Sequence, residues 1–351
     1  MRAFVIALAL AMLAGCANGR TTLEQRIEAL MRDYDGDVPG ASLLVLRDGV
    51  PLVRRSYGLA DMEAGVRAMP ATNYRLASVS KQFTAAAVLL LAQDGRLRLD
   101  DPVRRWLPSL PTVADAVTLH QLLTHTSGLL DYEDLMDPAD TRQVHDIDVL
   151  RLLETQDRTY FVPGSDYRYS NSGYALLALI VERASGQRYA DFLAARIFRP
   201  LGMTRTVAYE AGRSEVADRA FGYSVENGAW RRTDQSTTSA VLGDGGIYSS
   251  IDDLARWDAA LYDDRLLTDA SRELAFSPMT ATDDPQVRYG YGWRVTAGML
   301  WHSGESIGFR NVILRWPQRR LTVVLLTNRN DPEPYELATR IAALAMDESD
   351  R

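Results

Sequence analysis

The sequence predicts an α+β fold in which both ends of the chain build one antiparallel sheet, flanked by helices, and an all-helical lobe is inserted between them. Strand patterns occur near the start of the chain, over 41–59, and again near its end, over 289–327. Between them apolar residues recur mostly at helical spacing. No long Pro/Gly/Ser linker interrupts the chain. The expected parts are a sheet lobe over 22–75 and 286–348 and a helical lobe over 76–285.

The first elements are an amphipathic helix and a hairpin. Leu23, Ile27, Leu30 and Tyr34 follow helical spacing. Two apolar runs then flank Arg47-Asp48-Gly49, a sequence typical of a tight turn between antiparallel strands.

The later elements follow from the same periodicities. Helices are expected from Phe83 to Asp94, from Tyr174 to Arg183, from Tyr189 to Ile197, after Ser250 to Leu261, and around Leu337 to Leu344. Short aromatic or β-branched runs predict strands over 289–295, 299–303, 309–316 and 321–327.

The N-terminus is typical of an export signal. Arg2 precedes an apolar run over 3–13, which is too short to remain as a membrane-spanning helix. Leu13-Ala14-Gly15-Cys16 resembles the bacterial lipobox, which predicts a signal peptide over 1–15 and lipidation of Cys16. We expect an exported lipoprotein that faces the periplasm, and Ala17 after the cysteine favours the outer membrane. An ordinary secretory peptide is the alternative.

Composition excludes several classes of function. The 351 residues carry a formal net charge of −7, which argues against nucleic-acid binding because phosphate contacts need a basic surface. The sequence has only 4 histidines, and none pairs with another at i,i+4, so no metal site is expected. The expected partner is a small-molecule or peptide substrate, and the oligomeric state stays open.

A serine and a lysine stand three residues apart at the predicted start of a helix. Ser78-Val79-Ser80-Lys81 places a hydroxyl and an amine on one helix face. A serine hydroxyl becomes a useful nucleophile when a base takes its proton, and a partly desolvated lysine is able to do so. The helix start adds backbone donors near a reacting carbonyl.

Two further motifs support this pair. Tyr169-Ser170-Asn171 precedes an apolar helix and supplies a phenol for proton relay and an amide for orienting a lysine or substrate. His302-Ser303-Gly304 ends a predicted strand, where glycine allows a substrate backbone to approach.

Together these motifs resemble the three signatures of class C β-lactamases and their relatives, which include penicillin-binding proteins, D-alanyl-D-alanine carboxypeptidases, D-aminopeptidases and esterases. The likeness spans about residues 25–345. It includes a Leu-Thr-His-Thr-Ser-Gly-Leu segment over 123–129 and a Gly-Asp-Gly-Gly segment over 243–246. The resemblance implies the β-lactamase/transpeptidase-like fold and no cofactor.

The resemblance also implies roles for the site residues. Ser78 would form an acyl-enzyme, Lys81 and Tyr169 would share the proton transfers, and Asn171 would orient Lys81 and the substrate amide. The backbone N–H groups of Ser78 and Glu305 would form the oxyanion hole. His302, Ser303, Gly304 and Glu305 would line the substrate site.

Other candidate features have simpler interpretations. Gly304-Glu305-Ser306-Ile307-Gly308 matches a nucleophile elbow, but a strand is predicted after it and every histidine precedes it, so a turn is expected. His125 is expected in a structural loop. The acidic run over 33–37 lacks the spacing of a calcium loop, and the acidic stretch over 131–140 is interpreted as a mobile rim loop.

His302 departs from the lysine that is usual in efficient β-lactamases of this type. A neutral imidazole is expected to hydrogen-bond Tyr169 or a substrate carbonyl and to offer little charge to a carboxylate. The leading hypothesis is therefore a hydrolase of esters or D-amino-acid peptides. A true β-lactamase and a penicillin-binding sensor without turnover are the alternatives. Activity on carboxylate substrates is expected to improve toward pH 6, and Glu305 to disfavour anions unless Arg310 offsets its charge.

Overall fold

A single antiparallel sheet forms the centre of the molecule and draws strands from both ends of the chain. The computed structural model describes residues 22–349, so the predicted signal peptide and Cys16 lie outside the described residues. The strand order is β10-β11-β12-β13-β14-β15-β1-β2, and every neighbouring pair is antiparallel. This arrangement confirms the predicted α+β fold.

The strands of this sheet are β1 (Ala41–Arg47), β2 (Val50–Tyr57), β10 (Thr280–Ala281), β11 (Arg288–Tyr289), β12 (Arg294–Thr296), β13 (Met299–Ser306), β14 (Phe309–Trp316) and β15 (Leu321–Thr327). The α-helices are α1 (Leu23–Met31), α2 (Lys81–Gln93), α3 (Val103–Trp106), α4 (Leu119–Leu123), α5 (Asp146–Glu154), α6 (Asn171–Ser185), α7 (Tyr189–Leu193), α8 (Ile251–Ala260), α9 (Asp269–Phe276) and α10 (Tyr335–Ser349).

The hairpin of β1 and β2 forms as its turn residues predict. Asp48 has φ +53° and Gly49 has φ +76°, so both residues of the two-residue turn are left-handed. That conformation suits the right-handed twist of the flanking strands, and glycine adopts it without steric cost.

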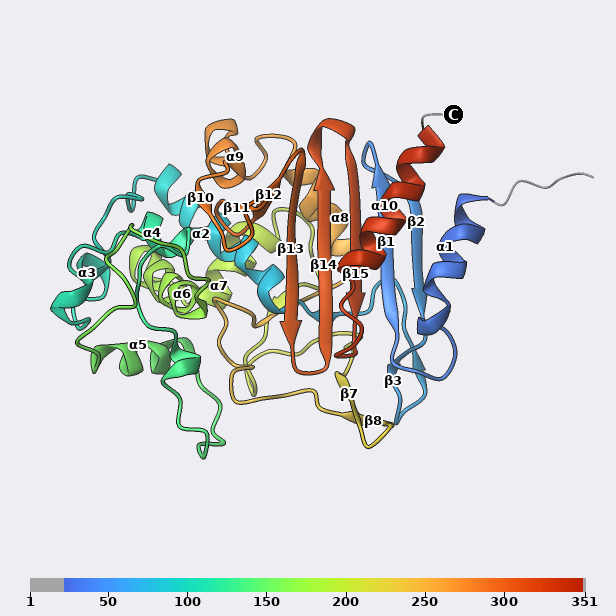
Figure 1. Ribbon diagram of the computed structural model, residues 1–351, viewed down its shortest axis with the longest axis horizontal. Helices are drawn as coiled ribbons and strands as arrows, with labels where there is room; N and C mark the ends of the chain where they lie inside the picture. The colour runs from blue at the N-terminus through green and yellow to red at the C-terminus, as the bar shows by residue number, and fades with distance from the viewer. Residues whose placement is uncertain (1–21, 350–351) are drawn as a thin grey trace, which may run out of the picture.

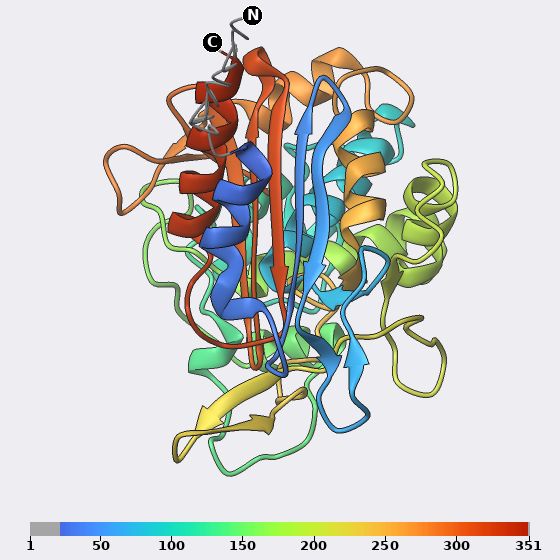
Figure 2. The ribbon, with the colours of Figure 1, turned by 90° about the vertical axis from the view of Figure 1, so that its right-hand side faces the viewer.

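Helices cover both faces of the sheet (Figures 1 and 2). Helices α1 and α10 lie side by side on one face, and α8 packs on the other face against β1 and β15. Alternate residues of β1 point to opposite sides, so Leu43 and Val45 enter the core below α1 and α10, whereas Leu44 and Leu46 enter the larger core. That larger core continues through α2 and α6, which joins the helical lobe to the sheet without a linker.

The helical lobe differs from its predicted boundary in two places. Strand β10 lies within 76–285 yet forms the edge of the central sheet. Helix α8 packs on the sheet, against β1 and β15, as well as on α2, where Trp257 contacts Phe83. A buried ion pair fixes α8 there: Arg315 of β14 donates to Asp258 of α8 over 2.6 Å. Periodicity identifies a helix but does not reveal which neighbour its apolar face meets.

Several short strands outside the central sheet were not predicted. They are β3 (Leu59–Asp61), β4 (Val66–Arg67), β5 (Tyr74–Arg75), β6 (Val207–Ala208), β7 (Tyr223–Glu226), β8 (Ala229–Arg232) and β9 (Ile247–Ser249). Strand β5 precedes the predicted nucleophile and pairs with β9, which brings the segment around residue 244 to the same place. Among the described residues, no helix is both long and apolar enough to cross a membrane.

Candidate active site

Ser78 lies in a 3-10 turn, η2 (Ala77–Ser80), that leads directly into α2. Ala77, the residue before it, has φ +49°, a left-handed conformation that costs a non-glycine residue free energy. Ser78 is half-buried, whereas its neighbours on both sides are buried. The turn therefore exposes one hydroxyl at the start of a long buried helix.

Lys81 is completely buried, and its ammonium is surrounded by acceptors. Its Nζ donates to Ser78 Oγ over 2.9 Å, to Asn171 Oδ1 over 2.8 Å and to the backbone carbonyl of Asp244 over 3.0 Å. Three acceptors match the three hydrogens of an ammonium group. The structure thus brings together the predicted nucleophile, the predicted base and Asn171.

Tyr169 lies over the lysine. Its ring centroid is 5.0 Å from Lys81 Nζ, close enough for a cation–π contact. The Tyr169 hydroxyl is buried and has no hydrogen-bond partner among the described residues, so its role in proton transfer stays a prediction. Ser170 caps α6 by accepting from the backbone of Gly173, and this cap fixes where Asn171 begins the helix.

His302 occupies a different position from the one expected. Its Nδ1 donates to the backbone carbonyl of Ser303 over 2.6 Å, and its Nε2 accepts from the Tyr289 hydroxyl over 2.9 Å. The expected hydrogen bond to Tyr169 is not made, since both ring nitrogens are already occupied. Burial, with Arg294 nearby, holds the pKa of His302 well below 6.5. The expectation that it gains charge toward pH 6 is therefore wrong, because the ring is buried behind the site.

Gly304 is also required for a reason other than the one predicted. A Cβ at this position would lie 2.0 Å from the backbone oxygen of Leu76, two residues before the nucleophile. The glycine therefore lets β13 approach the turn that holds Ser78, rather than a substrate backbone. Strand β13 reaches Ser306 and contacts η2 along this approach.

Glu305 and Ser303 lie on either side of that glycine. Ser303 is half-buried, and its carbonyl holds the His302 ring. Glu305 is exposed and forms an ion pair with Arg310 over 2.7 Å, across the register of β13 and β14. Arg310 therefore offsets the charge of Glu305, which was the condition set for the expected effect on anions. Ser78 and Glu305 line the same cavity, and their proposed oxyanion role stays a prediction.

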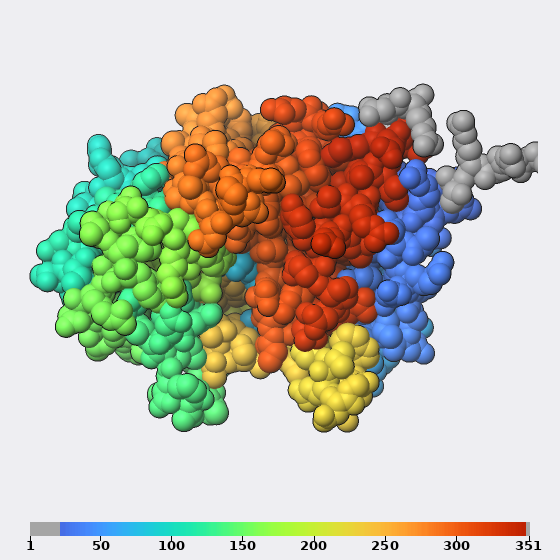
Figure 3. Space-filling model, in the orientation of Figure 1, coloured from blue at the N-terminus to red at the C-terminus, as the bar shows by residue number. Residues whose placement is uncertain are grey.

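A narrow cavity of about 60 Å³ opens beside Ser78. Figure 3 shows a hollow between the helical lobe and β13 in this region. The acidic side chains that line the cavity are those of Glu133, Asp244 and Glu305. Burial raises the pKa of both Glu133 and Asp244. Arg75 also lines the cavity, but its guanidinium donates to the Ser239 carbonyl and the Tyr248 hydroxyl.

Glu133 and Asp244 are site residues that the sequence interpretation missed. The stretch over 131–140 is not a uniform rim loop, because Asp131 and Tyr132 are buried and Glu133 contacts Asn171. Its beginning lies two residues after the Leu-Thr-His-Thr-Ser-Gly-Leu segment over 123–129, and that proximity was the available signal. Asp244 lies in the Gly-Asp-Gly-Gly segment that was noted only as a family feature.

The simpler interpretations of the other candidates agree with the structure. Ser306 ends β13 and pairs with Phe309 at the start of β14, so a strand follows it, not a helix. His125 is buried with φ +59°, and its Nδ1 accepts from the backbone N–H of Ser170. His125 therefore supports the loop that carries Tyr169. Asp37 pairs with Arg67 on the surface.

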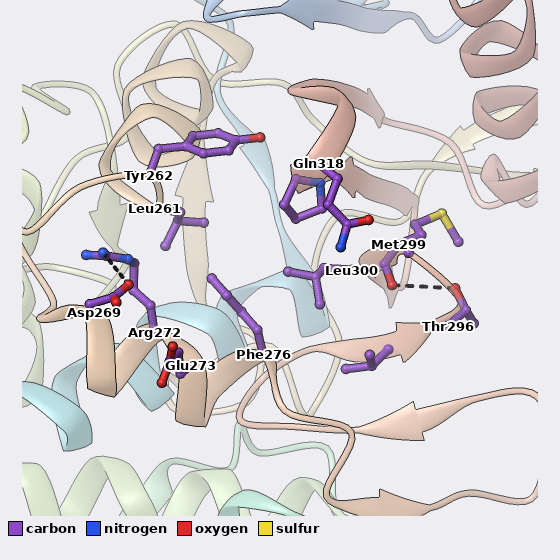
Figure 4. A pocket seen from close by; sticks show the side chains of 13 residues that line it. Leu261, Tyr262, Asp269, Arg272, Glu273, Phe276, Thr296, Met299, Leu300 and Gln318 are labelled. Carbon is purple, nitrogen blue, oxygen red and sulfur yellow. Dashed lines mark hydrogen bonds and ion pairs between the residues drawn. The ribbon is translucent and has the colours of Figure 1, made fainter.

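A second cavity, of about 470 Å³, lies at the opposite end of β13 (Figure 4). Apolar side chains such as Phe276 and Leu300 line it beside the ion pair of Arg272 with Asp269. It offers no nucleophile with an adjacent base. Within residues 22–349, no cluster of three or more His, Cys, Asp or Glu side chains is arranged to hold a metal ion.

Known proteins are similar to this chain in sequence and fold. A family model described as Beta-lactamase matches residues 23–347. Penicillin-binding protein 4* of Bacillus subtilis (strain 168) is 34% identical over 345 residues, which are 93% of this chain and 75% of that protein. The D-aminopeptidase of Gluconobacter oxydans (strain 621H) is 30% identical over 338 residues, 92% of this chain but only 61% of that protein. The solved D-amino acid amidase from Ochrobactrum anthropi SV3 superposes with a TM-score of 0.82 at 25% identity, covering 94% of this chain and 99% of that one.

Proposed function

The chain is a serine hydrolase that belongs to the beta-lactamase family, and from that premise we propose that it hydrolyses amides and peptides of D-amino acids that carry a free ammonium group. Esters are the second substrate class. The observation that carries the proposal is the pairing of Ser78 with Lys81 over 2.9 Å in a cavity lined by carboxylates.

The proposed reaction has two stages. Ser78 Oγ attacks the substrate carbonyl carbon while its proton passes, directly or through the Tyr169 hydroxyl, to the lone pair of Lys81 in its neutral amine form. The ammonium so formed then gives that proton to the leaving amine or alcohol as its bond breaks. Water then attacks the acyl-enzyme, gives its proton to the same pair and returns Oγ–H to Ser78. Asn171 holds Lys81 in place through both stages.

The carboxylate of Glu133 supports a cationic substrate, whereas Arg310 offsets the charge of Glu305 and burial favours the neutral form of Asp244. Glu133 lies at the side of Ser78, and its carboxylate is placed to accept from a substrate ammonium. A substrate carboxylate would meet like charge in the same place, and His302 offers it no positive charge. The similarity to a D-aminopeptidase and a D-amino acid amidase supports the same class.

A matched panel of substrates tests this proposal. It comprises a D-amino acid p-nitroanilide with a free ammonium, its N-acetyl counterpart, p-nitrophenyl esters, a D-Ala-D-Ala peptide and a chromogenic cephalosporin. We expect the free-ammonium anilide to exceed its N-acetyl counterpart in kcat/KM. Glu133→Gln keeps an acceptor for Asn171 but loses the charge, so this preference is expected to fall about tenfold. Ser78→Ala and Lys81→Ala are expected to abolish turnover of every substrate.

Two outcomes would replace the proposal. Faster hydrolysis of the cephalosporin than of every ester and D-amino-acid substrate would make the protein a β-lactamase. Stoichiometric labelling of Ser78 by penicillin, with no turnover of any substrate, would make it a penicillin-binding sensor.

A further inference from the structure

Three consecutive residues, Asp131, Tyr132 and Glu133, form hydrogen bonds with different residues around Lys81. We call them the 131–133 segment. Tyr132 and Glu133 lie in a 3-10 turn, η4 (Tyr132–Asp134), which Asp131 caps and which packs against α6. None of the three contacts Ser78 through a hydrogen bond among the described residues, so an effect on catalysis would act through the neighbours of Lys81.

Asp131 holds the start of α6. Its Oδ2 accepts from the Asn171 backbone N–H over 2.6 Å, from Ser170 Oγ over 3.0 Å and from the Ser172 backbone N–H over 3.3 Å. Its Oδ1 accepts from the Glu133 backbone N–H over 3.1 Å. A carboxylate is favoured at a helix N-terminus, where the backbone donors lack partners. Asp131 is 9% exposed, so these bonds are largely shielded from water.

Tyr132 reaches the opposite side of the lysine. Its hydroxyl donates to Asp244 Oδ2 over 3.0 Å, and its backbone N–H donates to Ser172 Oγ over 2.7 Å. The backbone carbonyl of Asp244 is one of the three acceptors of Lys81. Tyr132 therefore links the start of α6 to the loop that supplies this acceptor.

Glu133 sets the orientation of the Asn171 amide. Its Oε1 accepts from Asn171 Nδ2 over 3.0 Å. A carboxylate only accepts and an ammonium only donates, so the amide nitrogen must face Glu133 and the amide oxygen must face Lys81. The reversed amide would place a donor against Lys81 and an acceptor against Glu133.

We propose that Asp131 is a positioning residue of this active site and that, through the 131–133 segment, it holds Asn171 and Asp244 around Lys81 so that the Lys81 amino group stays beside Ser78. This inference rests on the proposed function, since it assumes that Lys81 activates Ser78. It assigns a role to a stretch that no catalytic motif of the sequence contains.

The test measures how fast Ser78 reacts, with Asp131→Asn as the main variant. The probe is a small alkyl fluorophosphonate, which carries no amide for Asn171 to bind. Its labelling rate constant reports the activation of Ser78, and its endpoint reports the fraction of competent enzyme. We expect the rate constant to fall at least about tenfold in Asp131→Asn while the endpoint stays near that of the wild type. A role in stability alone would lower the endpoint and leave the rate constant of the labelled fraction unchanged.

Asp137→Asn is the matched control, because it makes the same substitution on an exposed residue of the same loop. It is expected to keep the wild-type rate constant. An Asp131→Asn rate constant within twofold of the wild type overturns the inference. Absence of Ser78 labelling in the wild type would instead overturn the proposed function.

If Asp131→Asn does not fold, the labelling rate constant of Tyr132→Phe tests the inference in its place. This substitution removes only the hydroxyl that binds Asp244, and we expect the rate constant to fall about threefold or more. A wild-type rate constant in a folded Tyr132→Phe protein would then overturn the inference.

Discussion

The Tyr289 hydroxyl donates to Nε2 of His302 over 2.9 Å, and both rings are buried. Because the Ser303 carbonyl accepts from Nδ1 of the same ring, the imidazole is held as its neutral Nδ1–H tautomer. A proton at Nε2 would compete with the tyrosine hydrogen bond and place an unpaired charge in the interior.

We therefore expect the His302 ring to stay neutral from pH 8 to pH 6. Imidazole resonances in ¹H–¹⁵N NMR spectra, assigned with a His302→Gln variant, are expected to show no titration of His302 in this range. A midpoint at or above pH 6 would contradict the closed arrangement of Tyr289 and His302.

A lysine in place of His302 is expected to destabilise the protein rather than to improve cephalosporin hydrolysis. The buried position offers no carboxylate partner in its described hydrogen bonds, so an ammonium there costs about 3 kcal/mol or more of unfolding free energy. Urea denaturation of His302→Lys measures this loss. A variant as stable as the wild type that gains cephalosporin activity would restore the substrate role of this position.

Gly304→Ala is expected to remove most of the activity. The added methyl group would overlap the Leu76 carbonyl, a backbone atom that does not move aside, so β13 must shift away from the turn that holds Ser78. We expect a loss of about 100-fold or more in kcat/KM. Ser306→Ala, two residues along the same strand, is the control and is expected to retain activity. Comparable activity in both variants would show that the close approach of β13 is not needed.

The sequence predicted the strands with strong patterns well. Predicted ranges of 309–316 and 321–327 coincide with β14 and β15, because each strand has an apolar, β-branched centre and is bounded by turn residues. The predicted strand over 289–295 is instead two short strands, β11 and β12. Gly290 and Gly292 lie between them, and Gly292 has φ +74°, which interrupts an extended chain.

The site was predictable only where its residues belong to short motifs with a fixed spacing. Ser78, Lys81 and Asn171 meet as expected, because a helix start and a helix-entry loop fix where their side chains point. The orientation of the His302 ring was not predictable. Strand alternation tells which face of the sheet a side chain lies on, but not which hydrogen-bond partners lie on that face. Asp131 and Glu133 reach the site through a loop whose course depends on tertiary contacts, and an acidic loop sequence does not reveal such a course.

We also propose that Cys16 anchors the protein to a membrane. Lipidation of its thiol after removal of residues 1–15 would leave the mature protein with the membrane fraction, and mass spectrometry would detect the lipid on the first residue. Cys16→Ser is expected to release the protein or to block its processing. Wild-type protein found wholly in the soluble fraction would refute this proposal.

The last prediction concerns stability and pH, and it depends on a carboxyl behind the site. Asp146, the first residue of α5, accepts from the backbone N–H groups of Leu242 and Gly243 over 2.9 and 3.0 Å. Asp244, which follows Gly243 in the chain, accepts a hydrogen bond from Lys81 through its backbone carbonyl. Burial raises the pKa of Asp146 to about 7, against the effect of those two donors.

The folded protein therefore keeps a proton that the unfolded chain releases near pH 4. Between these two pKa values the folded state binds more protons, so the unfolding free energy falls as pH rises through this window and levels off above about pH 7. The contribution of Asp146 is about 1.4 kcal/mol per pH unit within the window.

Asp146→Asn keeps an acceptor oxygen but does not titrate. Urea denaturation at pH 5, 6, 7 and 8 is thus expected to show a smaller decline with pH in Asp146→Asn than in the wild type, whereas Asp157→Asn, an exposed control, follows the wild type. Equal slopes in the wild type and Asp146→Asn would mean that Asp146 is ionised in the folded protein throughout this range, held so by the two backbone donors.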